Sequence, residues 1–438
     1  MDAVSWAVRF RIRQQVRQSL WAVPLLGAIA GVVVSRIDVA LEGRWQLPAG
    51  WSYSSGTASS VLAAIAGAMV GLLGLVVTIT VLVVQMATGT LSARFMRLWY
   101  RDRVQKITLA AFTATFTFSY ALLRRIEPDS VPDIGVSAAG VAVTLDLILL
   151  LVYVDRFLHM LRPVAVAAAM AQAGLRIIRL MGDRSQVPYG ESGNGSAGTL
   201  GRRKPDVRVR AGQSGAIQAV HTEGLVRWAT RHSAVCVLPH AVGDFVIEGG
   251  VVVDVYGVAG TKEARRLRGM VALGHERTID QDPAFALRIM VDIAIRALSP
   301  AVNDPTTATQ LINHIGAFLT RIGSSETATR RIWLDPAARL RLVIPSRTWE
   351  DYLQLGVSEI RLYGVTSAQT SRRLRAMLSD LAEQVPADRR PAVAHQLTVL
   401  DRVVASSVSD PDDRRLALGQ DEQGIGGAGR HTAVDRSG

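Results

Sequence analysis

The sequence predicts a membrane α-helical protein with four transmembrane helices, followed by an α+β cytoplasmic domain with a small β-rich, barrel-like part and a helical part. The main observation is the segment from Val61 to Met86. It contains no ionisable side chain, and as a helix it is long enough to cross a hydrocarbon core of about 30 Å. Lipid offers no hydrogen-bond partners, so only a helix satisfies its own backbone there. After about residue 160 the chain becomes polar and mixed, as expected for a domain outside the membrane.

Three weaker apolar segments complete the predicted transmembrane domain of residues 1–160. The four spans are expected at about 19–40, 61–86, 107–123 and 134–154. The first segment is apolar until Arg36 and Asp38, which can lie at the membrane interface. A signal peptide is the competing interpretation, because basic residues precede it. No convincing cleavage site of small residues follows, so we expect a retained span.

The distribution of positive charge predicts the orientation. Arg and Lys are concentrated before the first span and between the second and third spans, whereas acidic residues offset the few Arg in the other loops. Positively charged loops remain on the cytoplasmic side. We therefore expect a multi-pass protein of the bacterial inner (plasma) membrane with both termini in the cytoplasm. Four spans agree with termini on one side.

Composition limits the partners. The chain has 438 residues and a formal net charge of +12. The basic residues are scattered or lie next to the predicted spans, so the sequence favours attraction to anionic lipid headgroups over binding of nucleic acid. The single cysteine, Cys236, excludes an intramolecular disulfide framework and suits a reducing cytoplasm.

Composition also divides the rest of the chain. Residues 161–204 should form a juxtamembrane helix and a flexible linker, and residues 205–273 a small β-rich domain with one helix at about 222–230. Residues 274–416 should form a helical domain, with helices at 349–362, 367–384 and 388–407 and one strand-like stretch at 339–344. The tail, 417–438, lacks core-forming residues and should be disordered.

Charged and turn-forming residues are concentrated before and within the predicted helices after Gly274. Asp282-Pro283 and Asp304-Pro305 each place a capping side chain before a proline, which is typical of a helix start. The simpler interpretation is structural, with caps and ion pairs. The alternative is a polar pocket at two helix amino termini that holds an anion or a metal. The candidate ligand-pocket residues are Arg277, Asp280, Asp282, Asp292, Arg296, Asn303 and Asp304.

Nothing in the sequence predicts catalysis, a cofactor or a metal. No nucleophile-base pair or metal-ligand set with recognisable spacing accompanies the charged cluster, so an enzyme is the least favoured class. His232, Cys236 and His240 recur every four residues, but Pro239 breaks any helix that would align them as zinc ligands.

Four sequence segments carry a resemblance to a known family. They are Ser214–Val220 (SGAIQAV), Gly243–Val246 (GDFV), Glu276–Asp282 (ERTIDQD) and Arg296–Ala308 (RALSPAVNDPTTA). With the predicted spans, they resemble the bacterial predicted-membrane-protein family catalogued as domain of unknown function 2254. The resemblance implies four amino-terminal spans and a cytoplasmic domain, and it implies no activity.

Polar and small residues within the predicted spans are the other candidates. Asp146 lies near the middle of a span, where a carboxylate is costly unless it is paired, protonated or next to a cavity. It can be functional, or it can be structural through a hydrogen bond to Thr115, Ser119 or Tyr120. Thr113 and Thr117 share a helix face, although their hydroxyls can bond to their own helix. The Gly-x-x-x-Gly spacings at Gly27–Gly31 and Gly67–Gly71 permit close helix packing.

These observations support two functional hypotheses. The first is an oligomeric channel-like or transport protein, with Asp146 and the Thr face near a permeation path and a cytoplasmic gating domain. The second is a membrane-anchored ligand sensor or scaffold that uses the polar pocket around Arg277–Asp304. Both expect the lipid bilayer with its anionic headgroups as a partner, and the protein is expected to be a homo-oligomer. The sequence does not identify the small ligand or ion.

Overall fold

A computed structural model describes residues 5–42, 52–90, 102–128, 130–160, 162–182, 186–189, 203–258, 263–325, 330–421 and 424. Contacts within the chain divide it into two compact units. The helical unit comprises Gln14–Arg162, and the sheet unit comprises Met1–Arg13 together with Pro163–Gly438. Helix α1 (Trp6–Gln18) begins in the sheet unit and ends in the helical unit.

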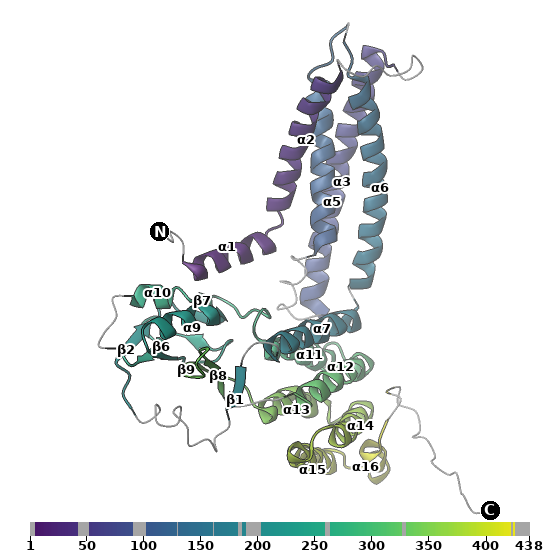
Figure 1. Ribbon diagram of the computed structural model, residues 1–438. Helices are drawn as coiled ribbons and strands as arrows, with labels where there is room; N and C mark the ends of the chain where they lie inside the picture. Colours follow the sequence, from purple (N-terminus) through teal and green to yellow (C-terminus); the bar gives the residue numbers. More distant parts are fainter. Residues whose placement is uncertain are drawn as a thin grey trace, which may run out of the picture. The chain divides into compact units, whose positions relative to one another are not determined.

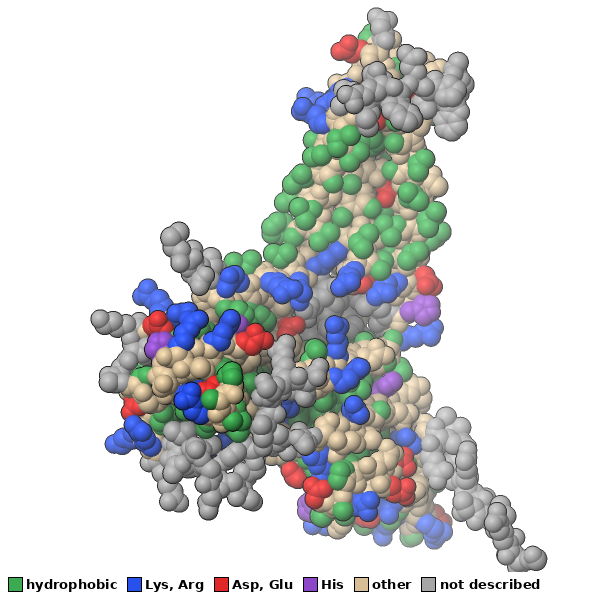
Figure 2. Space-filling view, viewed as in Figure 1, with side chains coloured by type: hydrophobic (Ala, Val, Ile, Leu, Met, Phe, Trp, Pro, Cys, Tyr) green, Lys and Arg blue, Asp and Glu red, His purple; other side chains and the backbone are tan. Residues whose placement is uncertain are grey.

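The helical unit is a bundle of long apolar helices. They are α2 (Ala22–Glu42), α3 (Ser55–Thr90), α5 (Arg103–Leu123) and α6 (Asp133–Met160). Side chains such as Leu62, Met69 and Phe112 are fully buried between them. Hydrophobic side chains also cover the visible outer face of these helices (Figures 1 and 2). Exposed apolar surface of this extent is typical of helices that contact lipid.

Within the described residues, four helices are individually long and apolar enough to cross a membrane. They are α3, α5, α6 and α7 (Pro163–Gly182), whereas α2 passes this test only when it is taken together with α1. The spans predicted at 61–86, 107–123 and 134–154 lie within α3, α5 and α6. Most of the span predicted at 19–40 lies within α2.

The two Gly-x-x-x-Gly spacings have different surroundings. A Cβ atom at Gly27 or Gly31 would overlap the backbone of α5 at Ala110 or Ala114, so these two glycines allow α2 to pack closely on α5. By contrast, a Cβ atom at Gly67 or Gly71 would have no neighbour within 4 Å in the part of the chain that the structure describes. The second small-residue face therefore has no neighbouring helix against these two glycines among the described residues.

The strands of the sheet unit form two sheets. The larger has the order β1-β8-β9-β4-β6-β2 and the smaller β5-β3-β7. The expected barrel-like arrangement is not confirmed, because these are two separate sheets. The strands are β1 (Gln186–Tyr189), β2 (Val207–Arg210), β3 (Gly215–Val220), β4 (Val235–Val237), β5 (Phe245–Val246), β6 (Val251–Tyr256), β7 (Val271–Gly274), β8 (Arg330–Leu334) and β9 (Leu340–Pro345).

The larger sheet joins the predicted β-rich and helical parts. Strand β9 pairs in parallel with β4, with Cys236 opposite Leu342. The boundary expected between residues 273 and 274 therefore falls inside one compact unit, because strands from both sides of it share a core. Cys236 is fully buried in this core, and burial raises the pKa of its thiol to about 12.

Helices α7 and α11 to α16 form a layered group in the sheet unit (Figure 1). Helix α7 packs on α11 and α12, where a Cβ atom at Gly174 would overlap the ring of Phe318. The juxtamembrane position expected for this helix stays a prediction, because Pro163–Leu180 is also long and apolar enough to span a membrane. The helices are α9 (Thr222–Arg231), α10 (Ala264–Arg268), α11 (Pro283–Ala297), α12 (Pro305–Gly323), α13 (Trp349–Gly364), α14 (Ala368–Gln384), α15 (Arg390–Ser407) and α16 (Pro411–Leu418), with a 3-10 helix at Ala387–Arg389.

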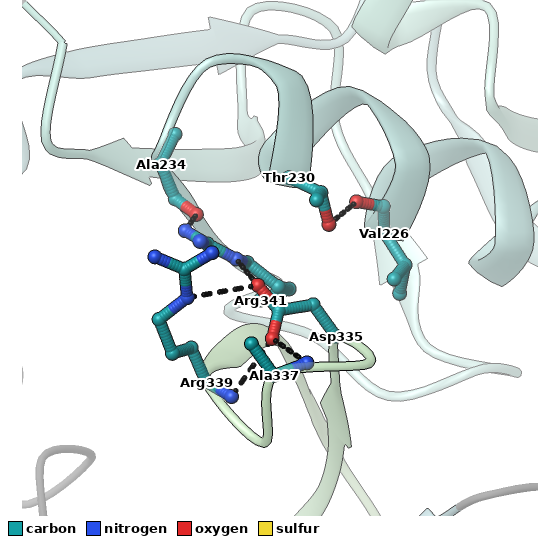
Figure 3. Close-up of polar contacts among 7 residues, drawn as sticks. All are labelled: Val226, Thr230, Ala234, Asp335, Ala337, Arg339 and Arg341. Carbon is teal, nitrogen blue, oxygen red and sulfur yellow. Dashed lines mark hydrogen bonds and ion pairs between the residues drawn. The ribbon is translucent and has the colours of Figure 1, made fainter.

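A buried aspartate organises the turn between β8 and β9 (Figure 3). Asp335 Oδ1 accepts hydrogen bonds from the backbone N–H groups of Ala337 and Arg339, both at 2.9 Å. Asp335 Oδ2 accepts from Arg341 Nε at 2.9 Å, and Arg341 Nη1 donates to Ala234 O at 3.0 Å, which ties the turn to the start of β4. The hydrogen bond from the Arg339 backbone is the largest of the effects that lower the pKa of Asp335, to about 2.

The start of the tail is ordered. Residues 417–421 and 424 were expected to be disordered, yet Asp421 is buried and its backbone oxygen accepts a hydrogen bond from Arg373 Nη1 at 3.0 Å. The Gly424 N–H donates to Asp421 Oδ1 at 2.8 Å. The rest of the predicted tail and most of the predicted linker lie outside the described residues, although β1 falls within that linker.

Candidate functional site

Side-chain hydrogen bonds connect the loop that precedes α11 to strand β3. Gln281 Oε1 accepts from the Val220 N–H at 2.9 Å, and Gln281 Nε2 donates to Val220 O at 3.2 Å. Gln218 Nε2 donates to Glu276 O at 2.9 Å. Residues 214–220 and 276–282, two of the segments that carry the family resemblance, therefore lie side by side.

A third segment of the family resemblance, Gly243–Val246, lies against the loop before α11 through Gly243. This residue has φ +95°, in the left-handed region that favours glycine. A Cβ atom there would also overlap Asp282 Oδ2. The GDFV segment therefore needs glycine both for its backbone conformation and for its close approach to Asp282. The fourth segment, residues 296–308, begins at the opposite end of α11, which at 15 residues is about 22 Å long.

Asp282 is a buried carboxylate with one unsatisfied oxygen. Its side chain caps α11, where Oδ1 accepts from the Phe285 N–H at 3.2 Å. Oδ2 has no hydrogen-bond partner in the part of the chain that the structure describes. Burial raises the pKa of Asp282 to about 6, against opposing effects from the nearby guanidinium groups of Arg347 and Arg277 and from hydrogen bonds of the helix backbone.

Asp282 lines a cavity of about 200 Å³ within the sheet unit. One wall is apolar and is formed by α7, β8, β9 and the residue before Gly243. Polar groups from three parts of the chain share the rest of the lining. The apolar residues are Ile177, Leu180, Ala241, Val242, Pro283, Trp333, Ile344 and Pro345, and the polar ones are Thr222, Asp280, Gln281, Asp282, Arg331, Ser346, Arg347 and Tyr352.

Two arginines and a tyrosine in this cavity come from segments after residue 329. Arg331 lies on β8, Arg347 follows β9, and Tyr352 lies in the first turns of α13. Burial lowers the pKa of Arg331 and raises the pKa of the Tyr352 hydroxyl, so low dielectric disfavours charge at both. Arg347 Nη2 also lies 3.6 Å from Asp244 Oδ1. The sequence did not predict that these three residues lie near Asp282. They are far from it along the chain, and the fold of β8, β9 and α13 brings them to the cavity.

Of the seven pocket candidates from the sequence, two line this cavity and a third lies near it. Asp280 and Asp282 line it, and Arg277 is close enough to Asp282 to affect its pKa. Asp292 instead pairs with Arg288, with Nε and Oδ1 2.6 Å apart, and Arg288 also binds Glu359. Arg296 lies in the last turn of α11.

The remaining two candidates, Asn303 and Asp304, form the connection from α11 to α12. Asn303 has φ +49°, and its N–H donates to Ser299 O at 2.8 Å. Asp304 Oδ1 accepts from the Thr307 N–H at 3.0 Å, and Oδ2 accepts from Thr307 Oγ1 at 2.5 Å. Both caps expected at Asp282 and Asp304 are therefore present. The Asn-Asp-Pro segment has a sufficient structural reason, because a left-handed residue, a cap and a proline start α12.

Two polar candidates in the helical unit, Thr113 and Thr117, make hydrogen bonds inside the bundle. Thr113 Oγ1 donates to Leu109 O of its own helix at 2.6 Å. Thr117 Oγ1 lies within bonding distance of Thr113 O in its own helix, at 3.0 Å, and of Ala28 O in α2, at 3.1 Å. Asp146 is buried, and its Oδ2 has no hydrogen-bond partner among the described residues. The functional and the structural interpretation of Asp146 therefore both stay predictions.

The chain matches a family model described as "Predicted membrane protein (DUF2254)" over residues 17–380. The chain belongs to this family. The resemblance expected from the sequence is thus confirmed, and the chain is a multi-pass membrane protein. DUF2254 describes a domain of unknown function, so membership alone assigns no activity.

Relatives in the mycobacteria match most of this DUF2254 protein. Uncharacterized proteins of Mycobacterium tuberculosis (strain CDC 1551 / Oshkosh) and of Mycobacterium bovis (strain ATCC BAA-935 / AF2122/97) are each 30% identical over 427 residues. Each alignment covers 94% of this chain and 81% of the relative. No solved structure matches this chain.

The cavity of this DUF2254 protein combines charged, polar and apolar side chains in its lining. Guanidinium groups can bind an anionic group, the Tyr352 hydroxyl and Asp282 Oδ2 can hydrogen-bond a polar group, and the apolar wall can cover a hydrophobic body. Among the described residues no three His, Cys, Asp or Glu side chains are grouped to hold a metal ion.

Proposed function

We propose that this DUF2254 protein is a membrane-anchored sensor whose ligand occupies the cavity beside Asp282. The observation that carries the proposal is the buried Asp282 carboxylate, with one unsatisfied oxygen, in a cavity that also contains two arginines. An unpartnered buried carboxylate oxygen destabilises the fold, and groups of this kind are concentrated at functional sites. A ligand that donates a hydrogen bond to Asp282 Oδ2 would remove that penalty.

The lining defines the class of ligand. Arg331 and Arg347 favour a carboxylate or phosphate, because guanidinium binds these groups with two parallel hydrogen bonds. Trp333, Ile344 and the α7 residues favour an apolar body. The ligand is therefore a small amphipathic anion with at least one hydrogen-bond donor.

Helix α7 offers a route from this cavity toward the membrane. Ile177 and Leu180 of α7 form part of the cavity wall, and α7 begins three residues after α6 ends at Met160. Helix α7 also packs on α11, whose amino-terminal cap is Asp282. A ligand that binds one position of α7 better than another would shift its equilibrium, and the chain connection would pass that shift to α6.

Thermal-shift measurements on the full chain in detergent test the pocket. We expect some members of a panel of small hydroxylated aryl carboxylates and alkyl phosphates to raise Tm, because a ligand at one hundred times its Kd adds about 2.7 kcal/mol. Arg331→Gln and Arg347→Gln should abolish the shift. Arg339→Gln is the matched control, since Arg339 is an exposed arginine on the same hairpin that does not line the cavity. The proposal fails if no compound shifts Tm, or if the control loses the shift equally.

A transport role is the second candidate, and Asp146 is the observation that favours it. Its buried carboxylate retains an unsatisfied oxygen inside the helical bundle, where unpaired charge is costly. Such a protein would be a homo-oligomer, and the open face of α3 at Gly67 and Gly71 supplies a surface for close contact with a second copy. The sheet unit would then act as the gate.

Ion flux into liposomes that contain the full chain tests this second candidate. Under it, the chain should conduct a monovalent cation or protons, and Asp146→Asn should reduce that flux about tenfold or more. Absence of flux, or a strictly monomeric chain in the membrane, would exclude it. We further propose the bacterial inner membrane and cytoplasmic termini, because the basic segments flank the predicted spans on one side.

A further inference from the structure

A second cavity, of about 250 Å³, lies in the sheet unit and shares no lining residue with the cavity beside Asp282. The first turns of α1 form one wall, and the loop between β2 and β3, helix α10 and strand β7 form the others. The neighbouring residues are Ser5, Ala7, Val8, Arg11, Gly212, Gln213, Arg265, Arg268, Gly269, Val271 and Leu273.

The lining of this cavity is positively charged, and no acidic side chain of the described residues belongs to it. Arg11, Arg265 and Arg268 contribute three guanidinium groups, and the described residues show no ion pair between any of them and a carboxylate. Arg11 Nη1 donates instead to Gln213 Oε1 at 3.4 Å. Arg266, on the same short helix, differs because it lies 3.4 Å from Glu263. Figure 2 shows basic side chains gathered on the visible face where Figure 1 places α10.

The first turn of α1, which forms one wall of this cavity, is held by hydrogen bonds and a ring contact. Ser5 Oγ and the Ala7 N–H both donate to Gly269 O, at 2.8 and 2.9 Å. The Trp6 ring stacks on the His221 ring, with centroids 4.9 Å apart. A Cβ atom at Gly269 would overlap Ser5 Oγ, so a larger residue there would displace the Ser5 hydroxyl. The site is therefore built from the amino-terminal helix and from residues 212–273, and it is incomplete without that helix.

We propose that this basic cavity, formed by Arg11, Arg265 and Arg268, binds a phosphate group. Three guanidinium groups around one cavity repel one another, and a bound phosphate would remove that repulsion through charge-assisted hydrogen bonds. Helix α1 ends at Gln18 and the apolar helix α2 begins at Ala22, so the wall that carries Arg11 lies close in sequence to a membrane segment. The phosphate belongs either to an anionic lipid headgroup or to a soluble phosphate compound.

The test measures Tm of the full chain in neutral detergent with three probes. These are inorganic phosphate, short-chain phosphatidylglycerol and short-chain phosphatidylcholine. The test variant combines Arg11→Gln, Arg265→Gln and Arg268→Gln. The control combines Arg13→Gln, Arg231→Gln and Arg266→Gln, which removes the same charge from α1, α9 and α10 outside the cavity. If the test variant does not fold, Arg265→Gln and Arg268→Gln are measured singly.

We expect phosphatidylglycerol or inorganic phosphate to raise Tm and phosphatidylcholine to leave it unchanged. The test variant should need about tenfold or more of the same probe for an equal shift, while the control responds like the parent chain. A shift with phosphatidylglycerol alone assigns a lipid headgroup, and a shift with inorganic phosphate assigns a soluble compound. No shift with either probe, or equal loss in test and control variants, overturns the proposal. The panel that tests the Asp282 cavity should still shift the test variant, so the two sites can fail separately.

Discussion

Asp335→Ala is expected to lower Tm of the full chain in detergent by about 5–10 °C. The change leaves the buried Arg341 guanidinium without its counter-charge, and it removes the acceptor for two backbone N–H groups of the turn. Both Asp335 and Arg341 are almost fully buried, at 5% and 4% exposure. Removing one partner of a buried ion pair leaves an uncompensated charge, which is far more costly than loss of a surface pair.

Two arginines bind the same carboxylate, and this provides the control. Arg339 Nε lies 3.2 Å from Asp335 Oδ2, but its side chain is 65% exposed. Arg339→Ala should therefore change Tm by no more than about 2 °C, because an exposed ion pair contributes little. Equal losses in Asp335→Ala and Arg339→Ala would show that burial of Arg341 does not determine the stability of this turn.

The Asp335 carboxylate also gives a sign for acid sensitivity. Its pKa in the folded chain is about 2, below the ordinary value of 3.8, so its stabilising contribution is complete above about pH 4. That contribution is lost as pH falls from about 4 through 2, because the unfolded chain binds the proton first. The Tm of Asp335→Asn should therefore change less between pH 4 and pH 2 than the Tm of the parent chain.

Local features of the fold could be predicted from the sequence. The Asp-Pro pairs at 282–283 and 304–305 specify helix starts through a cap and a fixed backbone angle, and both helices begin there. Apolar spacing likewise predicted α13, α14 and α15 within a few residues. The apolar segment around Val61–Met86 gave α3 for the same reason. In each case the determining contacts lie within a few residues along the chain.

Sheet pairing could not be predicted in this way. Strand β4 pairs in parallel with β9 about one hundred residues later, and no local pattern specifies which strands meet. Strand β1 lies in a segment too polar to resemble a strand, and it pairs with β8. The residues of the candidate site were only partly predicted for the same reason. The sequence grouped Asp282 with Asp304, which α11 separates, and it missed Arg331 and Arg347, which the sheet brings to Asp282.

Asp282→Asn is expected to raise Tm at pH 7.5 and to remove a pH dependence of stability between about pH 4 and 6. In the folded chain the pKa of Asp282 is about 6, above the ordinary value of 3.8, because burial disfavours its charge. The folded chain therefore binds the proton more tightly than the unfolded chain, and stability falls as pH rises through this window. The difference corresponds to about 3 kcal/mol at neutral pH, and asparagine avoids it while it retains the cap of α11.

Asp304→Asn separates this effect from capping. Asp304 caps α12 in the same way, but both of its carboxylate oxygens accept hydrogen bonds from Thr307. Asparagine there loses an acceptor and should lower Tm slightly. If Asp282→Asn lowers Tm as Asp304→Asn does, the Asp282 charge is already compensated, and the main argument for a ligand at that oxygen is lost. If Asp282→Asn is more stable but no longer responds to the anion panel, the unsatisfied carboxylate reduces stability and serves recognition.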